Sequence, residues 1–218
     1  MGPRPSHIVL RSEGVGVSTV AAIISDRPPE LYLSGCWDNL TQYIPVDVHV
    51  HVVDDTEHRL GMAGAVRAAW AWAVEQDADY LLHIEEDFRF IDLPLRAMQF
   101  VLDRHPHLAQ VVLKRQPWSD EEKRAGGQIE TNPGAYTQYG ALGRNVHWVE
   151  HSTLFSLNPC LIPRRTLELA WEPGNGGAER AITDACLAAG MRFAYFGKKE
   201  DPARCEHVGH IRSAGYRW

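Results

Sequence analysis

Apolar residues are distributed along this chain in two alternating patterns. Short runs rich in β-branched residues predict buried strands at 17–25, 46–53, 79–85 and 109–114. Between these runs, apolar residues recur every three or four positions and predict helices at 30–43, 61–76 and 95–102. This alternation of strand and helix is typical of an α/β fold with a mostly parallel sheet and helices on both faces.

The second half of the chain is less regular. Residues 116–150 are polar, rich in glycine and weakly periodic, which predicts an irregular insert that forms a flap. Beyond the insert, the pattern predicts strands at 152–162 and 192–196 and helices at 165–171 and 178–190, followed by an irregular tail. At 218 residues the chain fits a single domain, 1–218, with parts 17–115, 116–150 and 151–218.

Net charge, the length of the apolar runs and cysteine spacing argue against several classes of function. The formal net charge of −6 argues against sequence-independent binding to nucleic acid or to an anionic membrane. No apolar run is long enough to span a bilayer, and we find no signal peptide. The four cysteines lack CxxC spacing, which favours reduced thiols. We therefore expect a cytoplasmic protein with no membrane partner.

Acidic residues gather where the predicted strands end. Asp26 follows the first strand, Asp54 and Asp55 the second, and the third ends in Glu85, Glu86 and Asp87. In parallel sheets, ligands bind beyond the carboxyl ends of the strands. Strand alternation places Glu85 and Asp87 on one side and Glu86 on the other. Because adjacent acids repel one another, this cluster favours a bound Mg²⁺ or Mn²⁺; the alternative is a solvated acidic loop.

Histidines offer two further candidate ligand pairs. His49 and His51 form an H-x-H on the second strand, but the barrels that use such a pair for zinc need about 250 residues and eight strand–helix units. We interpret these two as structural. In the tail, His207 or His210 either completes the coordination of a metal or lies on the surface.

The order of strands and acids, with "HIEEDF" at the third strand and a histidine in the tail, resembles the GT-A glycosyltransferases, closest in style to family 2. The stretches "HIEEDF", "VVLKRQPWSDEEKRAGG" and "FSLNPCLIPR" also resemble glycosyltransferases of actinobacterial bacteriophages. The resemblance implies a GT-A-type Rossmann-like sheet, with a nucleotide-binding half at 17–115, the insert over the site, and an acceptor-side half and tail at 151–218.

The resemblance also implies roles for individual residues. The "EED" would stand for the family's D-x-D motif, with a glutamate where the first aspartate belongs. The implied metal ligands are Asp87 and His207, with His210 as the substitute. The residues implied to bind the nucleotide are Asp26, Arg27, Asp54, Gly61, Arg67, Glu85 and Glu86. The implied general base is Glu179, with Asp184 in reserve; the alternative for Glu179 is a helix-capping acid, a common use of glutamate.

The activity that follows is a metal-dependent glycosyltransferase reaction. With Mn²⁺ or Mg²⁺ it would move a sugar from a nucleotide-diphosphate sugar, UDP-sugar favoured, to an acceptor hydroxyl with inversion. The acceptor stays open among a small molecule, a protein such as a phage virion protein, and a modified DNA base; Trp118, Trp148 and Trp171 could stack on sugars or lie in the core.

Two other classes compete with this prediction. A sugar-phosphate nucleotidyltransferase shares a related sheet, but its Gly-rich phosphate loop would follow the first strand, whereas "SEGVGVSTV" starts before it. A non-catalytic module that binds a metal or a nucleotide is the other alternative.

Overall fold

The computed structural model describes residues 18–27, 31–56, 60–116, 138–142, 146–173, 177–198 and 200–209. The strands are β1 (Thr19–Ser25), β2 (His49–Asp54), β3 (Tyr80–Glu85), β4 (Phe88–Phe90), β5 (Leu108–Val112), β6 (Arg115–Gln116), β7 (Gln138–Leu142), β8 (Val146–His151), β9 (Cys160–Pro163), β10 (Arg192–Phe196) and β11 (Cys205–His207). The helices are α1 (Leu33–Leu40), α2 (Gly61–Glu75), α3 (Leu95–Arg104), α5 (Arg164–Leu167) and α6 (Gly177–Ala188).

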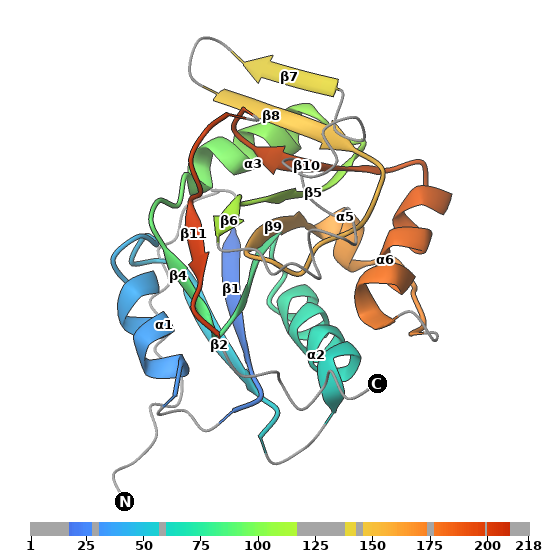
Figure 1. Ribbon diagram of the computed structural model, residues 1–218. Coiled ribbons are helices and arrows are strands. Elements are labelled where there is room, and N and C mark those ends of the chain that lie inside the picture. Colours follow the sequence, from blue (N-terminus) through green and yellow to red (C-terminus); the bar gives the residue numbers. More distant parts are fainter. Residues whose placement is uncertain are drawn as a thin grey trace, which may run out of the picture.

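An eight-stranded sheet in the order β2-β1-β3-β9-β5-β10-β8-β7 forms the centre of the fold (Figure 1). The pairs β1–β2, β1–β3 and β5–β10 are parallel, whereas β9 lies antiparallel between β3 and β5. The strands β2, β1, β3, β5 and β10 therefore point the same way. Their carboxyl ends share one edge of the sheet, which is where the predicted acids Asp26, Asp54 and 85–87 lie.

Helices cover both faces of this sheet, as the sequence predicts. Helices α2, α5 and α6 pack against one face, where Val66, Ile182 and Phe193 are fully buried. Helices α1 and α3 cover the other face, where Leu40 and Met98 are fully buried (Figure 1). Burial on both faces explains why the residues of β1 from Val20 to Ser25 are all buried rather than alternating with exposed positions.

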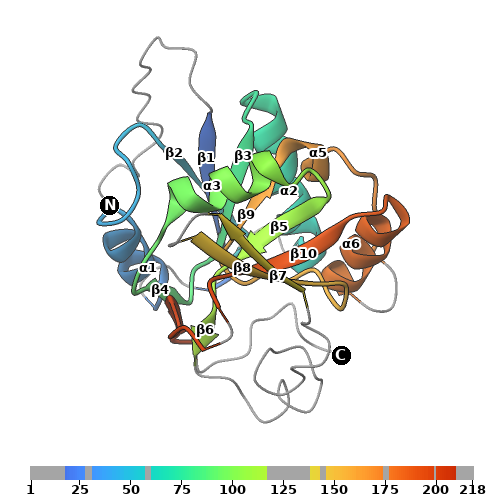
Figure 2. The same cartoon turned by 90° about the horizontal axis from the view of Figure 1, so that it is seen from above.

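A second, three-stranded sheet has the order β4-β11-β6. Strand β4 follows β3, β6 follows β5, and β11 comes from the tail, so the small sheet is built just past the carboxyl ends of the main strands. Figure 2 shows β4 and β6 close together beside α1. The tail is therefore not irregular throughout: β11 pairs with β4 on one side and with β6 on the other.

The prediction that residues 116–150 form an irregular insert is wrong for the last part of this range. Its last residues form β7 and β8, an antiparallel pair at the edge of the large sheet. Gly140 lies opposite Trp148 in this pair, and a Cβ on Gly140 would come within 1.8 Å of the indole. The buried tryptophan packs across the glycine and holds β7 and β8 together. The periodicity of apolar residues does not record such a contact, so it did not predict these two strands.

The elements after the insert differ from the predicted boundaries. The predicted strand at 152–162 is only β9, which starts at Cys160, because residues 152–159 form a loop. All four cysteines are free and buried, in agreement with the expectation of reduced thiols. Among the described residues, no helix has both the length and the apolar character needed to cross a membrane.

Candidate active site

The acidic residues at the end of β3 form a turn into β4, and Asp87 stands at its centre. Asp87 is 5 % exposed. Arg27 donates from Nη1 to Asp87 Oδ2 at 3.0 Å, and His207 Nε2 lies 3.2 Å from the same oxygen. Burial alone would raise the pKa of Asp87, but His207 and Arg27 hold it below its ordinary value. Three distant segments thus meet at one ionised carboxylate.

Glu86 points into the protein and holds the loop that follows β1. Its carboxylate accepts hydrogen bonds from Ser25 Oγ at 2.5 Å and from the backbone N–H groups of Asp26 and Arg27 at 3.3 and 3.1 Å. Burial raises the pKa of Glu86 to about 6, although Ser25 and Arg27 favour its charged form. These contacts make Glu86 a brace for the Asp26–Arg27 loop; the nucleotide contact that the resemblance assigns to Glu86 stays a prediction.

Two carboxylate oxygens of the cluster are buried without a hydrogen-bond partner among the described residues: Glu85 Oε1 and Asp87 Oδ1. Burial, together with the charges of Asp87 and Glu179, raises the pKa of Glu85 well above its ordinary value. Buried acceptors without donors are costly unless a cation or a proton satisfies them. Hard oxygen ligands beside a histidine nitrogen fit Mn²⁺ or Mg²⁺, so the residues present fit the predicted cation.

The tail closes on this turn through backbone contacts. Val208 N–H donates to the carbonyl of Asp87 at 2.9 Å, and the ring of His207 lies 5.0 Å from that of Phe88. A Cβ on Gly209 would come within 2.2 Å of Asp87 Oδ2, so this position requires a glycine. The predicted ligand His207 is therefore next to Asp87, whereas His210 lies outside the described residues.

Glu179, the predicted base, comes from the first turn of α6. Its Oε1 accepts a hydrogen bond of 2.8 Å from Leu157 N–H, and Thr183 donates from Oγ1 to its carbonyl at 2.6 Å. Its charge contributes to the raised pKa of Glu85, so α6 brings it to the same acidic region. The hydrogen bond from Leu157 fixes the orientation of the carboxylate, as a proton acceptor requires.

The reserve base and the predicted contact on α2 lie elsewhere. Asp184 is exposed and pairs with Arg180 one turn away on α6, at 3.1 Å. Arg67 donates to the carbonyl of Trp171 at 2.8 Å and to Glu172 at 2.7 Å, with its guanidinium over the indole ring of Trp171. These contacts tie α2 to the segment before α6, and a nucleotide contact of Arg67 stays a prediction.

The acids after β2 organise the start of α2. Asp54 accepts from Thr56 N–H at 3.0 Å and from the Thr56 hydroxyl, and Asp55 accepts from the backbone N–H groups of Leu60 and Gly61. Asp55 thereby satisfies donors at the start of the helix. Gly61 has a φ of 68°, a conformation that favours glycine. Binding of a base by Asp54 remains a prediction.

The remaining aromatic and histidine candidates pack within the fold. His51 stacks on Trp72 of α2 at 4.7 Å and His49 meets the edge of the same ring, which agrees with a structural role for this pair. Trp148 is 2 % exposed, and Trp171 packs against the core. Trp118 lies outside the described residues.

Sequence reasoning missed His83, which lies directly behind the acidic turn. It stands on β3 two positions before Glu85, and therefore on the same face of the sheet, between Ala22 of β1 and Cys160 of β9. His83 is fully buried, and neither ring nitrogen has a hydrogen-bond partner among the described residues. The period-2 alternation of β3 was the signal that could have located it.

Replacing His83 with leucine is expected to make the protein more resistant to acid. Burial lowers the pKa of His83 from 6.5 to about 4, so the unfolded chain takes up a proton here more readily than the folded chain as the pH falls below 6.5. The wild type therefore loses about 2 kcal/mol at this side chain between pH 7 and pH 5, a loss that His83→Leu avoids. Urea unfolding at both pH values measures the difference; identical pH dependences in the two proteins would contradict it.

Comparison with known proteins shows similarity at the level of structure. No protein-family model matches the sequence, and no curated protein sequence matches it. The A197 protein from STIV superposes with a TM-score of 0.53 at 14 % identity, over 89 % of this chain and 98 % of A197. TarS 1–349 from S. aureus gives 0.55 at 12 % identity, over 88 % of this chain and 60 % of that one.

A third structure, GalNAc-T7 with UDP, GalNAc and Mn²⁺, gives a TM-score of 0.56 at 9 % identity, over 91 % of this chain and 45 % of that one. The chain therefore spans about half of GalNAc-T7. At identities this low, the likeness concerns the fold alone. With its mixed sheet covered by helices on both faces, the chain has a GT-A-like fold.

Proposed function

We propose that the protein is a metal-dependent glycosyltransferase that moves a sugar from a nucleotide-diphosphate sugar, UDP-sugar favoured, to an acceptor hydroxyl with inversion. The observation that carries the proposal is the cluster at the end of β3. Glu85 and Asp87 each bury a carboxylate oxygen without a partner among the described residues, and His207 lies beside Asp87. The GT-A-like fold supports it, since this cluster lies at the edge of the sheet where ligands bind.

In this proposal Asp87 and His207 hold Mn²⁺ or Mg²⁺, and Glu85 faces the ribose or a bound water. A divalent cation there supplies positive charge against the negative charge that builds on the leaving diphosphate. Arg27 keeps Asp87 ionised, as its 3.0 Å hydrogen bond to that carboxylate indicates. Glu86 sets the position of Arg27 by accepting its backbone N–H.

Glu179 is the group proposed to move a proton. It accepts the proton of the acceptor hydroxyl, whose oxygen then attacks the anomeric carbon on the face opposite the nucleotide. The hydrogen bond from Leu157 N–H to Glu179 Oε1 holds the carboxylate in place before the acceptor arrives. A small molecule, a protein such as a phage virion protein, and a modified DNA base all offer a suitable hydroxyl. We propose a cytoplasmic site of action, in the host if a phage encodes the chain.

A thermal-shift experiment followed by a donor screen tests the proposal. UDP at about 100 times its dissociation constant is expected to stabilise the protein by about 2.7 kcal/mol, but only when Mn²⁺ is present. Release of free sugar from a panel of activated sugars with Mn²⁺ would then identify the donor. Stabilisation by Ca²⁺ alone would instead indicate a non-catalytic module, and turnover of a sugar phosphate with a nucleoside triphosphate would indicate a nucleotidyltransferase.

A further inference from the structure

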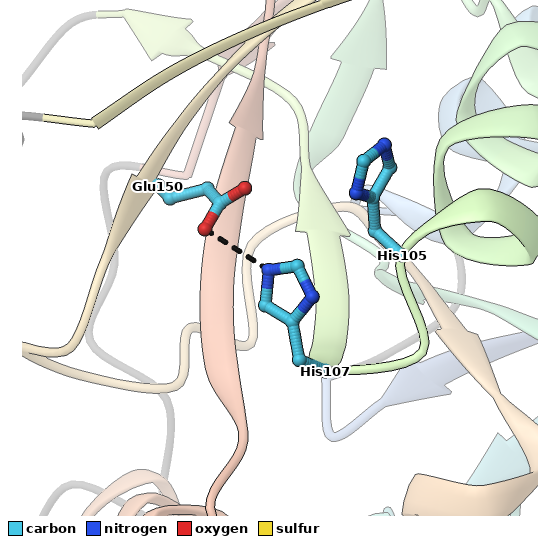
Figure 3. Close-up of side chains that lie close together, drawn as sticks. All are labelled: His105, His107 and Glu150. Atoms are coloured by element: carbon cyan, nitrogen blue, oxygen red, sulfur yellow. Dashed lines mark hydrogen bonds and ion pairs between the residues drawn. The ribbon is translucent and has the colours of Figure 1, made fainter.

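A second group of potential metal ligands lies far from the acidic turn. His105 follows the last residue of α3, His107 precedes β5, and Glu150 belongs to β8 (Figure 3). Strands β5 and β10 begin here, with Glu150 beside Ala194 of β10, so the group lies at the edge of the sheet opposite the carboxyl ends. It is thus separate from Asp87 and its neighbours.

The three side chains converge. One ligand atom from each of His105, His107 and Glu150 lies within 4.8 Å of the other two. His107 Nε2 is 3.1 Å from Glu150 Oε2, and Figure 3 shows Glu150 and the ring of His105 on either side of His107. Within the described ranges of the chain, no other group of three His, Cys, Asp or Glu side chains converges in this way.

The supporting contacts hold these ligands before any ion binds. Trp148 donates from Nε1 to Glu150 Oε1 at 2.9 Å, which leaves Oε2 on the side of His107. Arg165 donates to the carbonyls of Pro106 and Leu108 at 3.0 and 2.8 Å and so fixes the turn that carries both histidines. Such outer contacts orient metal ligands and strengthen binding.

We propose that His105, His107 and Glu150 form a binding site for a divalent transition-metal ion, with Zn²⁺ as the preferred ion. Two imidazoles and one carboxylate are a ligand set that zinc uses, with water as the fourth ligand. Zinc–ligand bonds of about 2.0–2.2 Å place tetrahedral ligands roughly 3.3–3.5 Å apart. Separations of up to 4.8 Å between the ligand atoms therefore shorten by at most about 1.4 Å when the ion binds.

The charges around the site are compatible with this closure. Arg192 faces the site, with Nε 3.8 Å from Glu150 Oε2, too far for a hydrogen bond. Its side chain is 38 % exposed, and it can turn to solvent when a cation takes its place. A bound ion joins the turn before β5 to β8 across the start of β10.

Calorimetric titration of the full chain with Zn²⁺ tests the site. The probe is applied to Asp87→Asn/His207→Ala protein, so that ions bound near the acidic turn do not contribute. This protein is expected to retain one zinc site, and adding His107→Ala is expected to weaken binding at least 100-fold. The His107 side chain is 41 % exposed, so its loss leaves the fold intact.

Two further variants make the result specific. Glu150→Gln keeps an oxygen for the Trp148 indole and is expected to weaken zinc binding at least 10-fold through the lost charge. His49→Ala removes one histidine of the other H-x-H pair and is expected to leave binding unchanged. Equal zinc affinity with and without His107, or loss of binding with His49→Ala, would overturn the proposal.

Discussion

Glu179→Gln is expected to lower the rate of sugar transfer by about 10²- to 10⁴-fold, the usual contribution of a general base, while donor binding stays within about twofold. The glutamine keeps a side-chain oxygen that can accept the hydrogen bond from Leu157 N–H, so the start of α6 stays in place. Only the ability to take a proton is lost. Initial rates with the donor found in the screen, together with the dissociation constant of UDP and Mn²⁺, measure both effects.

Asp184→Asn is the matched test on the same helix. Asp184 is exposed and pairs with Arg180, so its loss is expected to leave turnover near that of the wild type. If Asp184→Asn instead lowered turnover and Glu179→Gln did not, the base would be Asp184. Full activity of both variants would show that neither Glu179 nor Asp184 is the general base.

Asp87→Asn is expected to abolish the stabilisation that UDP gives in the presence of Mn²⁺. In the wild type, about 2.7 kcal/mol of stabilisation corresponds to a rise of roughly 5–10 °C in Tm for a domain of this size. The asparagine has neither the charge to hold a dication nor a counter-charge for Arg27. The unliganded variant is therefore also expected to be less stable, by about 1–3 kcal/mol.

The comparison is made within each variant, with and without UDP and Mn²⁺, so the lower starting stability cancels. Glu206→Gln is the control, because Glu206 is an exposed acid next to His207 on β11. It is expected to keep the full rise in Tm. An undiminished rise in Asp87→Asn would place the cation elsewhere and remove the main support for the proposed function.

Much of the first half of the fold follows from local sequence patterns. Strands β1 and β3 and helices α2 and α3 lie close to their predicted ranges, because a buried run or a helical stripe records the burial of each segment. The acids that follow β1, β2 and β3 were predicted to lie together because the carboxyl ends of parallel strands meet at one edge of the sheet. The position of these acids at one edge of the sheet could therefore be predicted from the sequence alone.

The parts that were missed depend on contacts between distant segments. Strand β11 has three residues and no periodicity of its own; β4 and β6 make it a strand. Strand alternation ends at Glu85, so the turn rather than the pleat decides where Glu86 and Asp87 point. The strand predicted at 152–162 includes most of β9, but its antiparallel place between β3 and β5 depends on pairing with those distant strands and was not predicted.

Because one of its residues lies on the three-residue strand β11, the candidate site is less stable to local opening than the central sheet. His207 reaches Asp87 only while β11 stays paired with β4 and β6, and these pairings join only three and two residue pairs, against six for β1 with β2 and six for β1 with β3. A local opening of this strand would separate the two side chains while the central sheet remained folded. Any ligand that bridges Asp87 and His207 therefore also holds β11 against β4 and β6. The observed affinity of such a ligand includes the free energy of keeping β11 docked.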